Sequence, residues 1–154
     1  MHRDYMSGFS LTKFLLVLVA ILIIVGSGMT ATYFVLKQQQ TASAQQFVGE
    51  FISKIEKNDP QSTFSSFSTT LKGDDQQVNY LTWYFWMSVF NTNENKVIIA
   101  QPPESVTYKN DSIINVIKSN ESITFVYSTS ANSKIAFEVV KSNNRWVLNN
   151  YAAL

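Results

Sequence analysis

The chain has no cysteine, and its one histidine, His2, lies ahead of everything that could fold into a domain. The absence of cysteine excludes a disulfide framework, a thiolate metal site and a lipidated cysteine. The absence of any later histidine excludes an imidazole base or ligand from the rest of the chain. Charge is sparse as well, at 15% of 154 residues and a formal net charge of +1. Because nucleic-acid binding requires clustered positive charge, we expect no nucleic-acid partner.

One stretch lacks charge altogether. Residues 14–36 (FLLVLVAILIIVGSGMTATYFVL) are uncharged, and the first half of this stretch is entirely apolar. At about 1.5 Å per residue the stretch makes roughly 35 Å of helix, enough to cross a hydrocarbon core of about 30 Å. We expect a transmembrane or signal-anchor helix, which makes the lipid bilayer an expected partner. The alternative, a core helix buried in protein, fits poorly with such an uninterrupted apolar block.

The flanking charges predict the orientation of this helix. Arg3 and Lys13 precede the apolar stretch, and Lys37 follows it. The positive-inside rule places residues 1–13 in the cytoplasm and the rest of the chain outside the cytoplasmic membrane, as a single-pass protein. A cleaved signal peptide is the competing interpretation, since Ala42-Ser43-Ala44 has a small-x-small pattern. That pattern lies well beyond the apolar core, too far for ordinary processing.

The junction before the apolar stretch resembles the type IV prepilin junction. Residues 8–17 (GFSLTKFLLV) consist of a glycine, then a phenylalanine that opens an apolar helix. The resemblance implies leader cleavage between Gly8 and Phe9. In that family the fifth mature position is usually a glutamate, whereas here it is Lys13, a reversal of charge. The implied function is a minor-pilin-like filament subunit, with one long helix from Phe9 to about Asn58.

The next part of the chain has helical patterns. Residues 37–46 (KQQQTASAQQ) lack Gly and Pro, so they form either a linker or a continuation of the membrane helix. An amphipathic helix is predicted beyond them by the spacing of Phe47, Val48, Phe51, Ile52 and Ile55. Asp59 and Pro60 predict a new helix start, as N-cap and first helical residue. The apolar stripe of that second helix consists of Phe64, Phe67 and Leu71, with Gly73 as its end.

The segment from Val78 to Phe90 is the densest aromatic cluster, and we expect a third helix there, with a strand as the alternative. Asp74 and Gln77 resemble a capping box at its start. A helical wheel leaves no polar face: one side carries Val78, Leu81, Phe85 and Val89, and the other carries Tyr80, Trp83, Trp86, Met87 and Phe90. The aromatic side is either core or a surface for an apolar ligand, a protein partner or the membrane interface. The candidate site residues are Tyr80, Trp83, Trp86 and Met87.

The C-terminal part has β-branched runs separated by Asn/Ser turns. The predicted strands are Ser112–Lys118, Ser122–Ser128, Lys134–Lys141 and Arg145–Tyr151. Their connections have hairpin length, which predicts an antiparallel meander. Two shorter candidates, Val97-Ile98-Ile99 and Val106-Thr107-Tyr108, flank Pro102 and Pro103. Helices followed by a meander predict an α+β domain with the helices packed on a curved four-stranded sheet.

The order of these elements resembles the cone-shaped superfamily of nuclear-transport-factor-like and cystatin-like domains. The residues that carry the resemblance are Ala44-Gln45-Gln46-Phe47-Val48, Phe51, Lys57-Asn58-Asp59-Pro60, Phe137-Glu138-Val139-Val140-Lys141 and Asn144-Arg145-Trp146-Val147-Leu148. Small bacterial members with one N-terminal membrane helix are similar. The resemblance covers about residues 42–151 and implies that helices fill the concave side of a curved sheet. With the orientation predicted above, we expect an extracytoplasmic cone-like α+β domain over residues 47–154.

No residue pattern in the domain indicates catalysis. Enzymes of that superfamily use Asp, His or Tyr inside the cone, whereas the carboxylates here fall at helix caps, on polar faces or in loops. Glu138 is the one in mid-strand, and its alternation with Phe137 and Val139 places it on the opposite face. Catalytic, phosphate-binding and metal-binding motifs are absent, so we expect no enzyme, no metal and no cofactor. The predicted function is a membrane-anchored binding or assembly module, with the pilin-like subunit as the alternative.

Overall fold

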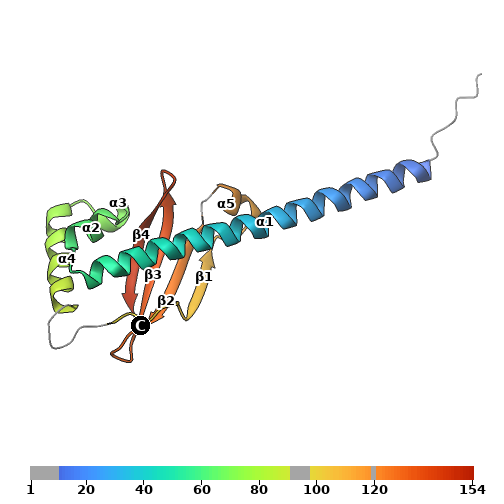
Figure 1. Cartoon of the computed structure of the whole chain (residues 1–154). Coiled ribbons are helices and arrows are strands. Elements are labelled where there is room, and N and C mark those ends of the chain that lie inside the picture. Colours follow the sequence, from blue (N-terminus) through green and yellow to red (C-terminus); the bar gives the residue numbers. More distant parts are fainter. Residues whose placement is uncertain (1–10, 91–97, 119–120) are drawn as a thin grey trace, which may run out of the picture.

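The computed structural model describes residues 11–90, 98–118 and 121–154. One long helix carries a small α+β domain on its C-terminal half, and its N-terminal half projects from that domain (Figure 1). The expected fold class is confirmed. The helices are α1 (Leu11–Glu56), α2 (Pro60–Ser65), α3 (Thr69–Lys72), α4 (Gln76–Phe90) and α5 (Ile113–Lys118); the strands are β1 (Ser105–Lys109), β2 (Ser122–Ser128), β3 (Lys134–Ser142) and β4 (Arg145–Ala153).

Helix α1 is continuous over 46 residues. The glycines in its apolar half do not interrupt it. In the same stretch the hydroxyls of Thr30 and Thr32 donate to the carbonyls of Gly26 and Gly28, one turn earlier. Residues 37–46 are helical throughout, so the chain has no flexible connection between its apolar half and the domain. Side chains 14–32 are all exposed, and contact with the domain begins at Tyr33.

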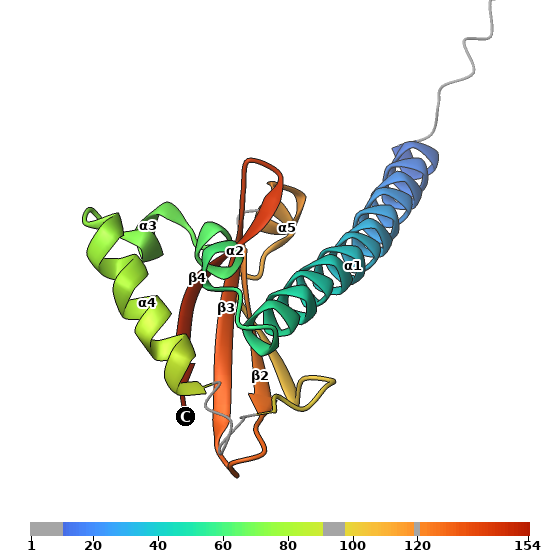
Figure 2. The same cartoon turned by 60° about the vertical axis from the view of Figure 1, so that its left-hand side comes forward.

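The four strands form one antiparallel sheet in the order β1-β2-β3-β4. Phe125 of β2 lies opposite Phe137 of β3, which lies opposite Tyr151 of β4. The turn between β3 and β4 places Asn143 and Asn144 at φ angles of 50° and 60°, a left-handed conformation that asparagine tolerates. Helices α1 and α4 lie over the sheet (Figure 2). The Phe51 ring of α1 meets the Phe137 ring of β3 edge-on, with 5.7 Å between their centroids.

The helical connection from α1 to α4 follows the sequence signals in part. Asp59 caps α2, as expected, by accepting a hydrogen bond from the Ser62 backbone N–H at 3.0 Å. The single helix predicted up to Leu71 is wrong, because the chain breaks at Phe67 to form a bridge with Leu148 of β4. Two short helices, α2 and α3, result. Helix α4 is capped by Asp75, which accepts from the Val78 N–H at 3.1 Å, rather than by Asp74.

The strand predicted over Ser112–Lys118 is also wrong, since these residues form α5. Three contacts explain the difference. The Ser112 hydroxyl accepts from the Asn115 N–H, as a helix cap does, and the Asn115 amide donates to the Asn110 carbonyl. Gln40 of α1 donates to the Val116 carbonyl at 2.6 Å. These contacts outweigh the strand preference of the β-branched side chains, and the fourth strand is the shorter candidate, β1.

The other short candidate does not form a strand in the part that is described. Ile99 makes an isolated bridge with Thr129, and Val97 lies outside the described residues. Glu138 lies on the face of the sheet opposite Phe137 and is half-exposed. The core is therefore confined to one side of the sheet, between the strands, the C-terminal half of α1 and α4.

Candidate functional site

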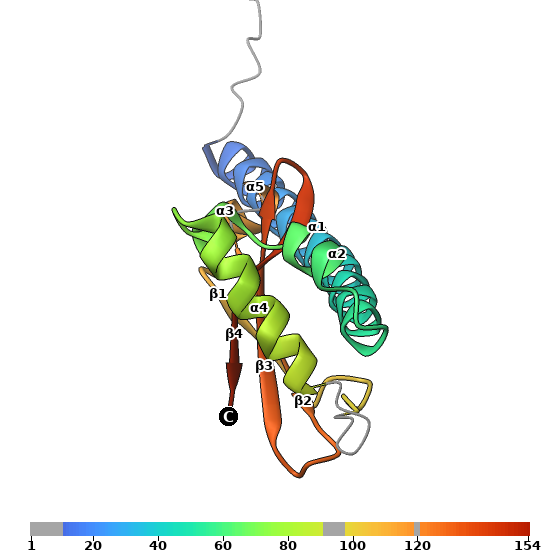
Figure 3. The ribbon, with the colours of Figure 1, turned by 90° about the vertical axis from the view of Figure 1, so that its left-hand side faces the viewer.

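Helix α4 lies at the end of the domain farthest from the apolar half of α1. Figure 1 shows the two at opposite ends of the molecule, and Figure 3, viewed from the α4 end, shows α4 in front of the sheet. The helix therefore has one face toward the domain and one face directed away from it. We call the second face the distal face.

The inward face of α4 contains two of the predicted site residues. Trp83 and Met87 are 2% and 0% exposed. The Trp83 indole N–H donates to the Thr63 hydroxyl of α2 at 2.8 Å, and the Met87 sulfur lies 3.2 Å from the same hydroxyl. The Trp83 ring packs edge-on against Phe67 at 4.9 Å between centroids. Both residues belong to the core, which is held to α2 by a buried polar contact.

Tyr80 and Trp86, the other two candidates, are half-buried at the borders of this face. Trp86 stacks on Trp83 with centroids 5.2 Å apart. Tyr80 meets Phe64 of α2 edge-on at 5.3 Å. A cavity of about 420 Å³ opens between α2 and α4, lined by Gln61, Phe64, Ser65 and Tyr80. Phe64 and Tyr80 form the aromatic part of its lining, and Gln61 and Ser65 form the polar part; we call this cavity the recess.

The distal face itself is made of Val78, Leu81, Tyr84 and Phe85, all exposed, with Phe85 at 70%. No charged residue occurs between Gln76 and Phe90. The sequence separates the two faces of this helix but does not indicate which one packs on the sheet. A tertiary contact accompanies the observed orientation: the Trp83 indole N–H, which needs a partner when buried, donates to the Thr63 hydroxyl of α2.

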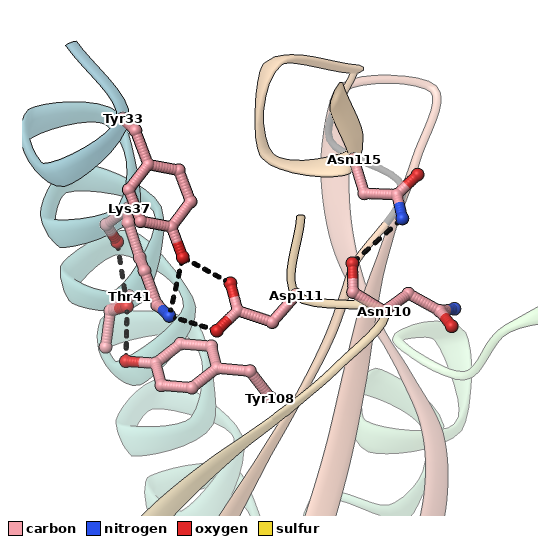
Figure 4. Close-up of polar contacts among 7 residues, drawn as sticks. All are labelled: Tyr33, Lys37, Thr41, Tyr108, Asn110, Asp111 and Asn115. Atoms are coloured by element: carbon pink, nitrogen blue, oxygen red, sulfur yellow. Dashed lines mark hydrogen bonds and ion pairs between the residues drawn. The ribbon is translucent and has the colours of Figure 1, made fainter. Parts of the chain in front are cut away.

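A second group of polar residues lies where α1 meets the domain, and sequence reasoning missed it. We call it the clasp; it consists of Tyr33, Lys37 and Thr41 on α1, Tyr108 at the end of β1, and Asp111 (Figure 4). Lys37 Nζ lies 2.5 Å from Asp111 Oδ2, and the Tyr33 hydroxyl donates to Asp111 Oδ1 at 2.6 Å. The Thr41 and Tyr108 hydroxyls are 3.0 Å apart. Lys37 Nζ also lies 4.0 Å from the centre of the Tyr108 ring.

The clasp keeps its two charged groups ionised. Hydrogen bonds from Lys37 and Tyr33 lower the pKa of the Asp111 carboxyl. Burial alone would lower the pKa of Lys37, but its hydrogen bonds to Asp111 and Tyr33 and the charge of Asp111 raise it above 10.5. An ion pair that also receives a tyrosine hydrogen bond and lies against a ring is held in one geometry. It therefore positions β1 and α5 on α1.

Glu121, just before β2, is the one deeply buried carboxyl of the described residues. It is 1% exposed, and neither carboxylate oxygen has a hydrogen-bond partner there. Burial raises the pKa of this group, the charge of Asp111 raises it further, and Lys37 opposes the shift. A carboxyl in such a place favours its neutral form. In the described part of the chain, no three potential metal-ligating side chains lie together.

Among the described residues, α1 is the one helix long and apolar enough to cross a membrane, and its apolar part is unburied. The predicted cleavage site, Gly8 and Phe9, lies outside those residues. Comparisons with protein-family models, with curated proteins and with solved structures found no match to the chain. Its function therefore has to be inferred from its own geometry.

Proposed function

We propose that the chain is a single-pass, membrane-anchored, non-catalytic binding or assembly module with its α+β domain outside the cytoplasmic membrane. The observation that carries the proposal is the shared helix. Residues 14–32 of α1 are apolar and exposed, whereas Ala44, Val48 and Phe51 of the same helix lie in the domain core. An exposed apolar helix of this length is stable in a bilayer rather than in water. The domain is thus held on a stiff support.

The partner in this proposal is a protein that packs on the distal face. This face points away from the bilayer that α1 would span, so that bilayer cannot cover it. Clustered exposed apolar side chains, here Leu81, Tyr84 and Phe85, mark interaction surfaces in soluble domains. The absence of charge on α4 favours an uncharged partner surface. The recess beside Tyr80 receives an apolar side chain of the partner.

Site-specific photo-cross-linking in intact cells tests this proposal. A benzophenone amino acid replaces Phe85 in the full chain, and a matched control places it at Asn143, in the exposed β3–β4 turn. We expect a cross-linked product of defined mass from position 85 alone, and we expect Leu81→Glu to abolish it. Equal products from both positions, or none from position 85, contradict the proposal. A product of twice the chain mass identifies the partner as a second copy.

A pilin-like filament subunit is the second candidate. The observation that favours it is the unbroken course of α1 from Leu11 to Glu56, with its apolar half exposed. In a filament, copies of that half would bury one another. Helices α2–α4 would then be an insertion between the long helix and the sheet of the head. Processing after Gly8 distinguishes this candidate from a permanent anchor.

We also propose that the domain is a cone-shaped one of the kind that its sequence resembles. Helices α1 and α4 pack on one face of the sheet, and Trp83 and Phe51 fill the space between helices and strands. In a cone of that kind, this aromatic core would fill the space that a ligand would otherwise enter. This favours a partner on the outside of α4 over a small apolar ligand inside the domain.

A further inference from the structure

The part of α1 that makes no contact with the domain is about as long as the hydrocarbon core of a bilayer is thick. Side chains 14–32 are exposed, and Tyr33 is the first whose exposure is reduced by the domain. That length corresponds to about 28 Å of helix at 1.5 Å per residue. The hydrocarbon core of a bilayer is about 30 Å thick. A spanning α1 therefore has no spare length between the membrane and the domain.

Helix α5 is the element of the domain closest to this boundary. Asp111, two residues before α5, is bonded to Tyr33 and Lys37 of α1. At the other end of α5, the Val116 carbonyl accepts from Gln40. Tyr33 and Gln40 are about 10 Å apart along the helix axis, whereas each headgroup layer is roughly 5–8 Å thick. Figures 1 and 4 show α5 beside α1 on the side toward the apolar half. The contacts therefore place α5 at the depth of the headgroups.

The side chains that α5 presents suit that environment. Ile114 is 63% exposed, although α5 is attached to α1 by its other side. Lys118 at the end of α5 and Lys109 at the end of β1 are exposed, and neither forms an ion pair with any described residue. The nearby Asp111 is neutralised by Lys37. The surface of an anionic bilayer attracts lysines that lie close to it, and its boundary layer accommodates an apolar side chain such as Ile114.

We propose that α5 is a second membrane contact, in which Ile114 enters the headgroup layer and Lys109 and Lys118 attract anionic headgroups of the bilayer that α1 spans. This inference rests on the proposed membrane anchor. Such a contact would fix the orientation of the domain relative to the membrane. A single membrane helix is free to rotate and tilt in the bilayer. Here the clasp joins α1 to the segment that leads into α5, so the contact of α5 with the membrane surface would fix the tilt of α1. The distal face of α4 is then directed away from the membrane.

The depth of single spin labels in liposomes tests the contact. Because the chain contains no cysteine, each of three variants of the full chain carries one label: Ile114→Cys in α5, Val25→Cys in α1 and Ser88→Cys in α4. The liposomes contain phosphatidylcholine with phosphatidylglycerol, and accessibility to oxygen and to a nickel chelate reports depth. We expect a deep label at position 25, an aqueous label at 88 and a shallow membrane label at 114.

The outcomes separate this inference from the proposed function. A label at position 114 as aqueous as the one at 88, with position 25 still deep, overturns the α5 contact and leaves the anchor in place. An aqueous label at position 25 overturns the anchor itself. An unchanged far-ultraviolet circular dichroism spectrum and melting temperature establish that each labelled chain is folded.

A charge test addresses the lysines. In the Ile114→Cys chain, the double substitution Lys109→Gln and Lys118→Gln should raise accessibility to the nickel chelate at least twofold in liposomes that contain phosphatidylglycerol. The matched control, Lys57→Gln with Lys72→Gln, removes two lysines from the far part of the domain and should leave accessibility unchanged. Equal accessibility in the two double variants overturns the role of Lys109 and Lys118.

Discussion

Lys37 Nζ and Asp111 Oδ2 lie 2.5 Å apart, although 74 residues separate them in the chain. The contact joins α1, where it leaves its apolar half, to the loop that leads into α5. The Tyr33 hydroxyl donates to the same carboxylate, so two side chains on adjacent turns of α1 bind one group of the domain. The direction of the domain relative to the helix is therefore set by side chains as well as by the continuity of α1.

Removing the negative partner should loosen this junction. We expect Asp111→Asn to lower the free energy of unfolding of the full chain by roughly 1 kcal/mol, because Asp111 is one-third exposed and solvent screens part of the ion pair. Urea unfolding in detergent micelles measures the change. The matched control is Glu104→Gln, which breaks the more exposed pair with Lys134 and should cost less. A larger loss in the control contradicts the structural role of the clasp.

The contribution of Asp111 should depend on pH in one direction. The folded-state pKa of Asp111 is lowered below 3.8 by its hydrogen bonds from Lys37 and Tyr33. The stability it contributes is therefore fully present at neutral pH and is lost as pH falls below 3.8. Because the charge of Asp111 also raises the pKa of Glu121, the comparison is made in a Glu121→Gln background. There the difference in unfolding free energy between the chains with and without Asp111→Asn should be constant from pH 5 to 7 and shrink at lower pH. A difference that grows on acidification contradicts this assignment.

Glu121 should give a pH dependence of the opposite sign. Burial, then the charge of Asp111, raises its pKa above 4.5 in the folded chain. The stability that protonated Glu121 contributes is therefore fully present below the pKa that Glu121 has in the unfolded chain. It is lost as the pH rises through the higher pKa that Glu121 has in the folded chain. We expect Glu121→Gln to become more stable relative to wild type as pH rises from 4.5 to 8, as measured by urea unfolding at a series of pH values. A difference between Glu121→Gln and wild type that stays the same across this pH range, or that falls as pH rises, would contradict the prediction.

The two faces of α4 should respond differently to truncation. Trp83→Ala removes a buried indole and its hydrogen bond to Thr63, and we expect a loss of about 3–5 kcal/mol. Phe85→Ala, on the distal face, should change stability by no more than about 0.5 kcal/mol. Thermal unfolding of the full chain in micelles compares them. A large loss from Phe85→Ala would show that the distal face is covered within the protein, which would remove it as a partner surface.

The sequence predicts local elements where a signal is made by neighbouring residues. The N-cap at Asp59, the turn at Asn143 and Asn144 and the long apolar helix are of this kind. Helix α5 was not predictable in this way, because Ile and Val favour strands and the bond from Gln40 that opposes them comes from a distant helix. The sequence does not predict the clasp either, because its residues come from distant parts of the chain. Lys37 is recognisable as a flanking charge, but nothing near it identifies Asp111 as its partner.

The orientation of α4 shows the same limit at the candidate site. Spacing separates Trp83 and Met87 from Leu81 and Phe85, yet both sets are apolar enough to enter a core. The choice is made by α2, whose Thr63 hydroxyl pairs with the Trp83 indole in the interior. Of the four residues singled out from sequence, Trp83 and Met87 are core, Tyr80 lines the recess, and Trp86 is half-buried beside Trp83. The exposed face was not among the predicted site residues.

The last prediction concerns the leader. We expect Met1 to Gly8 to remain on the mature chain, because Lys13 stands where the pilin-like pattern has a glutamate. If α1 is a membrane anchor with its N-terminus in the cytoplasm, this lysine would lie at the level of the lipid headgroups, where a positive charge is favourable. In a filament of packed apolar helices the Lys13 ammonium would be buried. The glutamate of the prepilin pattern is replaced by this lysine, so no such carboxylate could pair with it, at a cost of several kcal/mol. Intact-mass analysis of the protein extracted from membranes shows whether Met1 to Gly8 are retained or removed. A mature chain that begins at methylated Phe9 would make the filament subunit the preferred function, and Lys13→Glu should then increase filament assembly.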